Sequence, residues 1–304
     1  NKAINLYMES IKYFPKFPQS YSNLAVIKMN LGQLDEAETY AREAINLDPK
    51  FANAYFNLGN ILKLKGNLDA AKNFTLKAIE YNPQYEEADS NLGDILKNKS
   101  DYRNAEKYIR KALEINPYSY NSLMNLGLLL FNLGNFKEAE KYLQKSIEIN
   151  PNNAKAFSNL ANVYYRIGNL NEAERKGRMA IKLDPKLANS FSNLSVILLD
   201  LGKTKEAEIY ARKALEINPK ASNAFLNLGN ILTQLLQPKE AEKYTRKAIE
   251  LEPDYADAHF NLGNILQSIL EYDGALSCYR KAIELYEEGS QKSYKAIGEL
   301  GKTL

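Results

Sequence analysis

The chain has 304 residues, 40 of them basic and 37 acidic, with a formal charge of +3. Many acids stand four residues before a base, as Glu38 does before Arg42, which is typical of a solvated helix face and makes the small basic excess weak evidence for nucleic acid. No apolar run reaches membrane-spanning length, and the single cysteine, Cys278, excludes an intrachain disulfide and a thiolate metal cluster. We therefore expect a cytoplasmic protein with no nucleic-acid or membrane partner.

A pattern of 34 residues recurs along almost the whole chain. Its position 7 is always leucine and its position 20 is always alanine, and no insertion interrupts the register from residue 18 to residue 289. Eight units begin at residues 18, 52, 86, 120, 154, 188, 222 and 256. Self-similarity at a fixed period predicts a repeat array, in which each unit contacts mainly its neighbours, so we expect one elongated domain at 18–289.

The segment before the array, residues 1–17, fits only the second half of a unit. Ala3 falls at position 20 of the pattern and Pro15 at position 32. We interpret this half repeat as the start of a fragment taken from a longer polypeptide, or alternatively as a lone helix that caps the array.

Each full unit is predicted to form a helix, a turn and a second helix. Positions 4, 7, 8 and 11 follow the spacing of a buried helical stripe, and position 8 is always small, which permits close helix approach. Position 15 is glycine in five units, where a left-handed backbone ends the first helix, and Ser100, Leu236 and Leu270 depart from this. The second helix ends before a proline at position 32 in seven units. Asp89 replaces the aromatic residue usual at position 4, so we expect the third unit to pack least well.

After the last unit the pattern changes. Residues 290–304 are predicted to form a C-terminal capping helix that covers the last apolar seam, as repeat arrays need. The alternative is that this segment leads into a further domain.

These recurring positions, above all leucine 7, the small residue at 8, alanine at 20 and 27 and proline at 32, resemble the tetratricopeptide repeat family. The resemblance covers nearly the whole chain. It implies an all-α, right-handed superhelical solenoid of helix-turn-helix repeats, with the first helices on the concave side.

A ladder of asparagines marks the free face of the first helices, opposite the buried stripe. Position 6 is asparagine in every unit: Asn23, Asn57, Asn91, Asn125, Asn159, Asn193, Asn227 and Asn261. Position 9 adds Asn60, Asn162, Asn230 and Asn264. A carboxamide carries donors and an acceptor like those of a peptide group, so a column of them is suited to bind an extended backbone without reading its side chains.

Units of the form AYFNLGNILKLKGNLDAAK also resemble the superhelical repeats of the O-linked N-acetylglucosamine transferase family. In that family, equivalent asparagines line the concave groove and hold substrate peptide backbone, and only this role of the position-6 asparagines is carried over. The catalytic domain of the family has no counterpart in these 304 residues.

Our hypothesis is a protein-protein interaction module that binds an extended peptide segment of a protein ligand along an asparagine-lined concave groove. The structural alternative is that the asparagines solvate the face or bond a neighbouring turn. Two other functions stay open: a structural scaffold or adaptor with end-to-end self-association, and the substrate-recruiting arm of a larger enzyme such as a glycosyltransferase. Cations on the free face are spread over three repeats, which argues against a clamp for a C-terminal carboxylate: Lys63, Lys97, Lys155 and Arg166.

The residues that could carry catalysis do not converge. His259, the only histidine, occupies an aromatic core position, and Cys278 stands where other units place Tyr40 or Phe74. Catalysis rests on a unique constellation, whereas the acids here recur with the surface pattern. We therefore predict no enzyme activity, no metal site and no cofactor.

Overall fold

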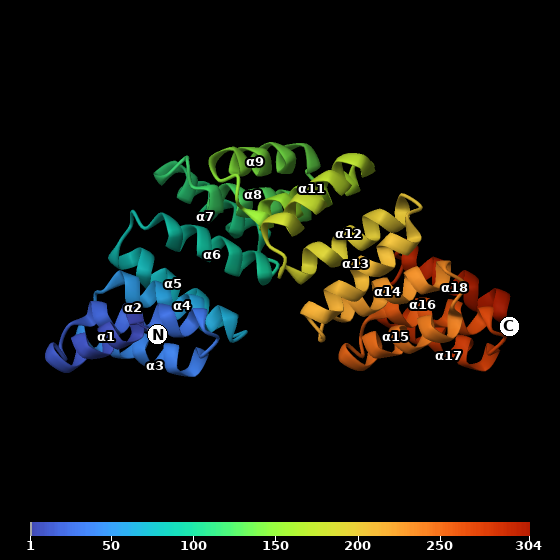
Figure 1. Cartoon of the computed structure of the whole chain (residues 1–304), viewed down its shortest axis with the longest axis horizontal. Helices are drawn as coiled ribbons and strands as arrows, with labels where there is room; N and C mark the ends of the chain where they lie inside the picture. Colours follow the sequence, from blue (N-terminus) through green and yellow to red (C-terminus); the bar gives the residue numbers. More distant parts are fainter. Residues whose placement is uncertain (1) are drawn as a thin grey trace. The chain divides into compact units, whose positions relative to one another are not determined.

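The computed structural model describes residues 2–304, and every regular element within them is an α-helix (Figure 1). The first helices of the eight repeats are α2 (Pro18–Asn30), α4 (Ala52–Leu64), α6 (Glu86–Asn98), α8 (Tyr120–Asn132), α10 (Ala154–Arg166), α12 (Ala188–Asp200), α14 (Ser222–Gln234) and α16 (Ala256–Ser268). The second helices are α3 (Leu34–Leu47), α5 (Leu68–Tyr81), α7 (Tyr102–Ile115), α9 (Phe136–Ile149), α11 (Leu170–Leu183), α13 (Thr204–Ile217), α15 (Pro238–Leu251) and α17 (Tyr272–Leu285). Two further helices flank them, α1 (Lys2–Tyr13) and α18 (Gln291–Thr303). The prediction of an all-α protein built from antiparallel helix pairs is confirmed.

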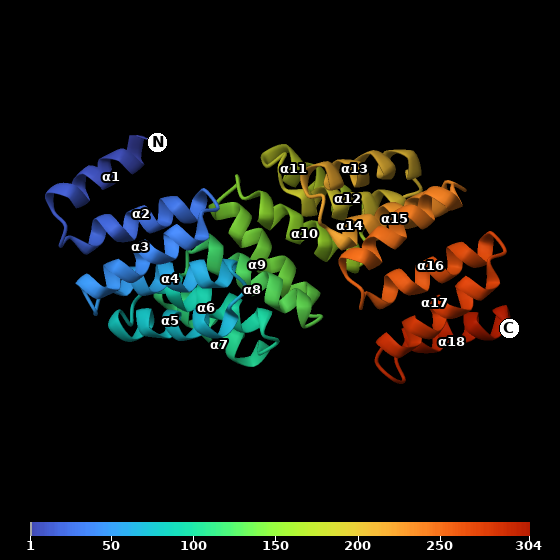
Figure 2. The same cartoon turned by 90° about the horizontal axis from the view of Figure 1, so that it is seen from below.

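The chain folds into two compact units, Asn1–Pro151 with α1 to α9 and Asn152–Leu304 with α10 to α18. In the first unit α1 packs beside α2, and in the second α18 packs beside α17 (Figure 2). How residues 1–17, 18–289 and 290–304 divide into domains stays a prediction.

The two helices of a repeat play different parts in each unit. First helices contact one another in the rows α2–α4–α6–α8 and α10–α12–α14–α16. No two second helices approach each other as closely among the residues that the structure describes. Because helices on the inner side of a curved stack lie closer together, the first helices line the inner side of each unit.

The predicted core stripe is buried. The eight leucines at position 7 are at most 2% exposed, and the eight alanines at position 20 are fully buried. Burial of apolar surface contributes roughly 25 cal/mol per Å², so this recurring set stabilises every helix pair in the same way.

The small residue at position 8 is matched to position 24 on the second helix of the same repeat. A Cβ added to Gly229 would lie 2.3 Å from Thr245 Oγ1, and one added to Gly59 would lie 2.4 Å from Thr75 Oγ1. Where position 8 carries a side chain, position 24 is small instead: the pairs are Ala25 with Ala41, Ala161 with Gly177, and Ser195 with Ala211. Glycine at position 8 therefore makes room for a larger partner.

This matching predicts a change of sign in a double-mutant cycle. Gly229→Ala alone should destabilise the chain, because overpacking costs about 1–3 kcal/mol and outweighs the gain of about 1 kcal/mol in helix propensity. In a Thr245→Ala background the clash is gone, so the same change should stabilise. Urea unfolding of the parent, the two single variants and the double variant measures the free energies of unfolding. If Gly229→Ala changed that free energy in the same direction in both backgrounds, the contact between residues 229 and 245 would not be what requires glycine at position 8.

The turn between the two helices adopts a left-handed backbone in every repeat. The five glycines at position 15 have φ between 74° and 81°, and Ser100, Leu236 and Leu270 have φ of 61°, 59° and 66°. The predicted left-handed turn is thus present even where the glycine is absent. The residue after the turn caps the second helix in four repeats, by accepting a backbone N–H bond: Asn67, Asp101, Asn135 and Asn169.

The non-glycine residues at position 15 have a strained, left-handed backbone, and glycine would relieve that strain. Leu236 and Leu270 are 87% and 70% exposed, so their side chains contribute little packing. A left-handed residue with a side chain costs about 1–2 kcal/mol, and the greater unfolded-state freedom of glycine offsets about half of that. Leu236→Gly and Leu270→Gly should therefore each raise the free energy of unfolding by about 0.5–1 kcal/mol.

The matched control for this prediction is Leu133→Gly. Leu133 is 48% exposed and lies just before the turn glycine of its repeat. The φ of Leu133 itself is −79°, a value that any residue adopts, so glycine at this position relieves no strain. Chemical denaturation should show destabilisation for this variant, and a gain equal to that of Leu236→Gly would remove backbone strain as the explanation.

The third repeat has an ion pair with a buried acid at the position of the usual aromatic residue. Asp89 is fully buried, and Lys111 Nζ lies 3.0 Å from its Oδ1 and 2.9 Å from its Oδ2. Burial raises the pKa of Asp89, and the charge of Lys111 opposes that rise. Glu86 is also buried, and it accepts a hydrogen bond from Ser122 of the next repeat. Whether this repeat is the least stable one stays a prediction.

Candidate functional site

The twelve predicted site asparagines all lie on first helices, in the two rows described above. Asn91 is buried and the other eleven are half-buried. Their environments differ, because some amides are bonded to the neighbouring repeat and others are not.

Three of the position-6 amides join one repeat to the next. In each case Nδ2 donates to the hydroxyl of a serine at position 5 of the preceding repeat: Asn57 to Ser22 at 2.9 Å, Asn125 to Ser90 at 3.1 Å, and Asn227 to Ser192 at 2.9 Å. All three serines are buried. Sequence reasoning missed them, although their spacing of 35 residues from the asparagine is a recurring signal.

Other amides in the rows bond different partners. Asn23 Nδ2 donates to Tyr7 Oη at 3.2 Å, and Asn261 Nδ2 donates to Asn230 Oδ1 at 2.7 Å. Asn264 Oδ1 accepts from a tyrosine hydroxyl of α17 at 2.9 Å. The structural role that sequence analysis weighed as the alternative is therefore present for part of the ladder.

The remaining four amides have no side-chain partner within residues 2–304. They are Asn60 in the first unit and Asn159, Asn162 and Asn193 in the second. The latter three lie on α10 and α12, which are in contact. This part of the second unit thus presents half-buried carboxamides whose donors and acceptors are open to a ligand.

In the first unit two lysines of successive first helices meet on one acid. Lys63 Nζ lies 3.0 Å from Asp94 Oδ2 and 2.6 Å from Asn91 Oδ1, and Lys97 Nζ lies 2.7 Å from Asp94 Oδ1. Burial alone would raise the pKa of Asp94, but the two lysine charges hold it below its usual value. Sequence reasoning treated these lysines as scattered charges, whereas the structure brings them together because both occupy position 12.

The remaining candidates for chemistry are separated. His259 Nε2 lies 2.8 Å from the carbonyl oxygen of Pro253, and burial raises the pKa of the Cys278 thiol. No three His, Cys, Asp or Glu side chains gather in a metal-binding arrangement in the part of the chain that the structure describes. None of the helices in residues 2–304 combines the length and apolarity needed to cross a membrane.

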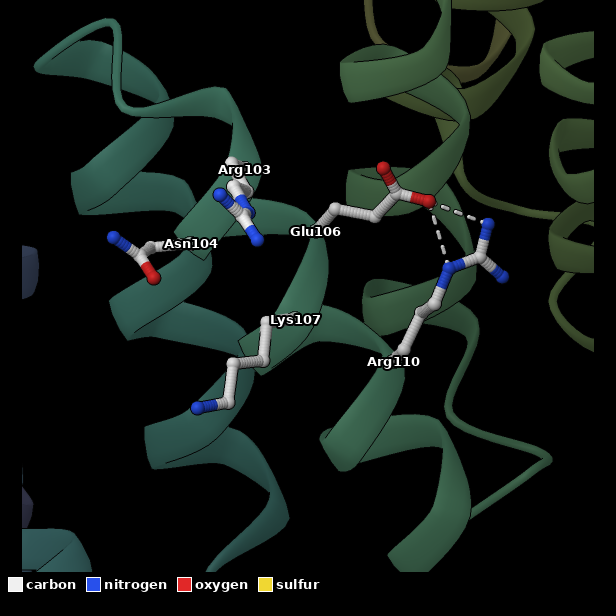
Figure 3. Close-up of a pocket in the computed structure, with 5 residues that line it drawn as sticks. All are labelled: Arg103, Asn104, Glu106, Lys107 and Arg110. Carbon is white, nitrogen blue, oxygen red and sulfur yellow. Dashed lines mark hydrogen bonds and ion pairs between the residues drawn. The ribbon is translucent and has the colours of Figure 1, made fainter.

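A hollow in the surface of the first unit lies away from the asparagine row. It measures about 500 Å³ and is lined by side chains of α7 alone. Figure 3 shows Glu106 bonded to Arg110, with Arg103, Asn104 and Lys107 outside that pair. Its charged, open lining is typical of a solvated helix surface.

The two kinds of amide predict opposite effects on stability. Asn227→Ala strands the buried hydroxyl of Ser192 and should cost about 1–3 kcal/mol, whereas Asn193→Ala removes an unbonded amide and should change little. Thermal and urea unfolding of the two variants measures the difference, with Asn125→Ala as a second bonded case. Equal losses of stability in the Asn193→Ala and Asn227→Ala variants would contradict the conclusion that the amide of Asn227 is bonded and that of Asn193 is not.

Four protein-family models match the chain. The model described as the cilia and flagella-associated protein 70 C-terminal domain matches residues 51–260, and tetratricopeptide repeat models match residues 6–39, 27–66 and 256–288. Among curated proteins no sequence matches. The tetratricopeptide repeat prediction is thereby confirmed.

Two of the solved structures that match this chain, with TM-scores above 0.5, show the same helical repeat fold. The structure of the APC/C hetero-tetramer Cut9–Hcn1 has a TM-score of 0.76 and 16% identity, over 86% of this chain and 52% of that chain, so this chain spans about half of its relative's length. TTC0263, a tetratricopeptide repeat protein of Thermus thermophilus, has a TM-score of 0.55 and 22% identity over 60% of this chain and 99% of that chain. YrrB, described as a repeat protein with an unusual peptide-binding site, has a TM-score of 0.43 and 24% identity over 60% and 95% of the two chains.

Proposed function

Since this chain belongs to the family of the cilia and flagella-associated protein 70 C-terminal domain, we propose that it is a cytoplasmic protein-binding module of cilia or flagella. Its ligand is an extended peptide segment of a partner protein. The peptide lies along the first helices, and the asparagine rows bind its backbone.

The observation that carries the proposal is the set of unbonded amides at Asn159, Asn162 and Asn193. A half-buried carboxamide has lost part of its hydration, so a ligand that bonds to it meets a smaller desolvation cost than at a fully exposed group. Packed helices lie about 8–10 Å apart and an extended chain advances about 3.3 Å per residue. A peptide running across α10 and α12 would therefore meet one amide at roughly every third residue.

The amides that are bonded to the preceding repeat support the peptide-binding row of asparagines indirectly. Asn57, Asn125 and Asn227 use Nδ2 to hold successive repeats together, which fixes the spacing of the row. Their Oδ1 atoms make no bond within the residues described and are acceptors for a ligand N–H. The two lysines on Asp94 add local charge to the first unit.

The proposal predicts that the peptide backbone matters more than its side chains. Peptides are first selected from a random-sequence library displayed on phage, with the whole chain as target. Asn159→Ala combined with Asn193→Ala should weaken the selected peptides roughly fivefold to a hundredfold, because each lost hydrogen bond is worth about 0.5–1.5 kcal/mol. Replacing single peptide amides by esters should weaken binding similarly, and alanine scanning of the peptide should have smaller effects.

The control variant combines Asn73→Ala and Asn171→Ala, two exposed asparagines on second helices. It removes the same number of amides from the other face and should bind as the parent does. Binding that survives the ester substitutions but fails in the alanine scan would overturn capture of the backbone.

Two alternatives use other parts of the chain. A self-associating scaffold is favoured by α1, which has no buried residue and exposes Leu6 and Met8. Sedimentation at increasing concentration tests end-to-end association through that helix. A recruiting arm of a larger enzyme, such as a glycosyltransferase, would use the same amides, in line with the resemblance of the position-6 asparagines.

A further inference from the structure

In the second unit, arginines at position 25 of the second helices form a ladder on the side away from the asparagine rows. In the fifth repeat Arg178 donates to the hydroxyl of Tyr210 at 2.9 Å and to Glu206 at 2.8 Å, both in the next repeat, and its guanidinium lies 5.7 Å from the Tyr210 ring centroid. The next repeat has the same arrangement. Arg212 donates to the hydroxyl of Tyr244 at 3.0 Å and to Glu240 at 2.8 Å, and its guanidinium lies 5.5 Å from the centroid of the Tyr244 ring. Each arginine also bonds a glutamate of its own helix.

The ladder breaks at its last step. The positions of the tyrosine and the second glutamate are taken by Cys278 and Gly274 in the eighth repeat, and Arg246 retains Glu242 at 2.8 Å. The aromatic residue at position 4 is also replaced, by His259. In the two preceding repeats the rings at positions 4 and 23 contact each other: Phe191 with Tyr210 and Phe225 with Tyr244, at centroid distances of 6.0 and 6.1 Å.

At the place of the missing rings the second unit has a groove of about 600 Å³, lined by residues of α15, α16 and α17. Arg246, Ile249, His259 and Cys278 line it. Two other charges at its edge are already neutralised: Lys281 by Glu284 at 3.0 Å and Glu250 by Lys247 at 2.5 Å. Arg246 thus has one carboxylate where Arg178 and Arg212 each have two, and it faces a space that holds a tyrosine in the earlier repeats.

We propose that this groove binds a partner segment that supplies the missing pair, a tyrosine side chain beside Cys278 and a nearby carboxylate on Arg246. The chain itself shows the chemistry, because its own arginines at this position bind a phenol, a ring face and a second acid. In the chain the acid and the tyrosine are four residues apart on a helix, a rise of about 6 Å. In an extended peptide the same span needs about two residues, so the partner motif is Glu-x-Tyr.

The probe is the peptide amide Glu-Gly-Tyr-Gly-Glu with fluorescein attached to its N-terminus through a diglycine linker, titrated against the whole chain by fluorescence anisotropy. We expect saturable binding that weakens about tenfold or more when the peptide tyrosine becomes alanine or its glutamates become glutamine. Arg246→Gln should produce a similar loss. Arg280→Gln is the matched control, because Arg280 occupies position 25 of α17 and is exposed outside the groove, and it should leave binding unchanged.

A second variant fills the groove from within. Gly274→Glu combined with Cys278→Tyr completes the ladder, so it should melt above the parent and lose the probe. Probe binding as tight to this filled variant as to the parent would overturn the proposal, and so would an alanine peptide that binds as well as the tyrosine peptide. The Asn159→Ala and Asn193→Ala combination should bind this probe unchanged, which separates this groove from the asparagine row.

Discussion

The structure depends on how closely the two helices of a repeat approach each other. Alanine at position 20 is fully buried in every repeat, and position 8 is glycine wherever position 24 carries a bulky side chain. With the helix distance fixed in this way, the first helix always presents the same positions to its neighbour. The regular spacing of the asparagines on one side and of the arginines on the other follows from that contact.

The two sides of the helix layer join neighbouring repeats by different chemistry. On the first helices three of the joints are neutral, with an amide donating to a buried serine hydroxyl as in Asn227 and Ser192, and the Lys63–Asp94 pair between α4 and α6 is a charged exception. On the second helices they are charged, with an arginine shared between two acids and a tyrosine as in Arg212. The arginine joints are partly exposed and are screened by salt, whereas the amide joints are half-buried and are not. Salt should thus weaken the joints between second helices more than those between first helices.

Much of this fold could be predicted from the sequence because the period is free of insertions. The helix pairs, the buried leucine at position 7 and the left-handed turn all follow from local spacing, even at Leu236, where the turn glycine is absent. The partners of the amides could not be predicted in the same way. Asn193 and Asn227 occupy the same position with similar neighbours, and only the packing of two repeats decides that one bonds a serine and the other does not.

A repeat array directs most of its recurring groups at its own neighbours, and this decides where a ligand finds a free partner. Where the pattern is intact, as at Arg178, the guanidinium is occupied by the next repeat and has little left for a ligand. Where a neighbour lacks the matching residue, the group keeps its position on a rigid helix but loses its partner. Asn159 on one side and Arg246 on the other meet this condition. Binding in such a protein is therefore expected at recurring groups that lack a partner in the next repeat, because groups that are bonded there have little left for a ligand.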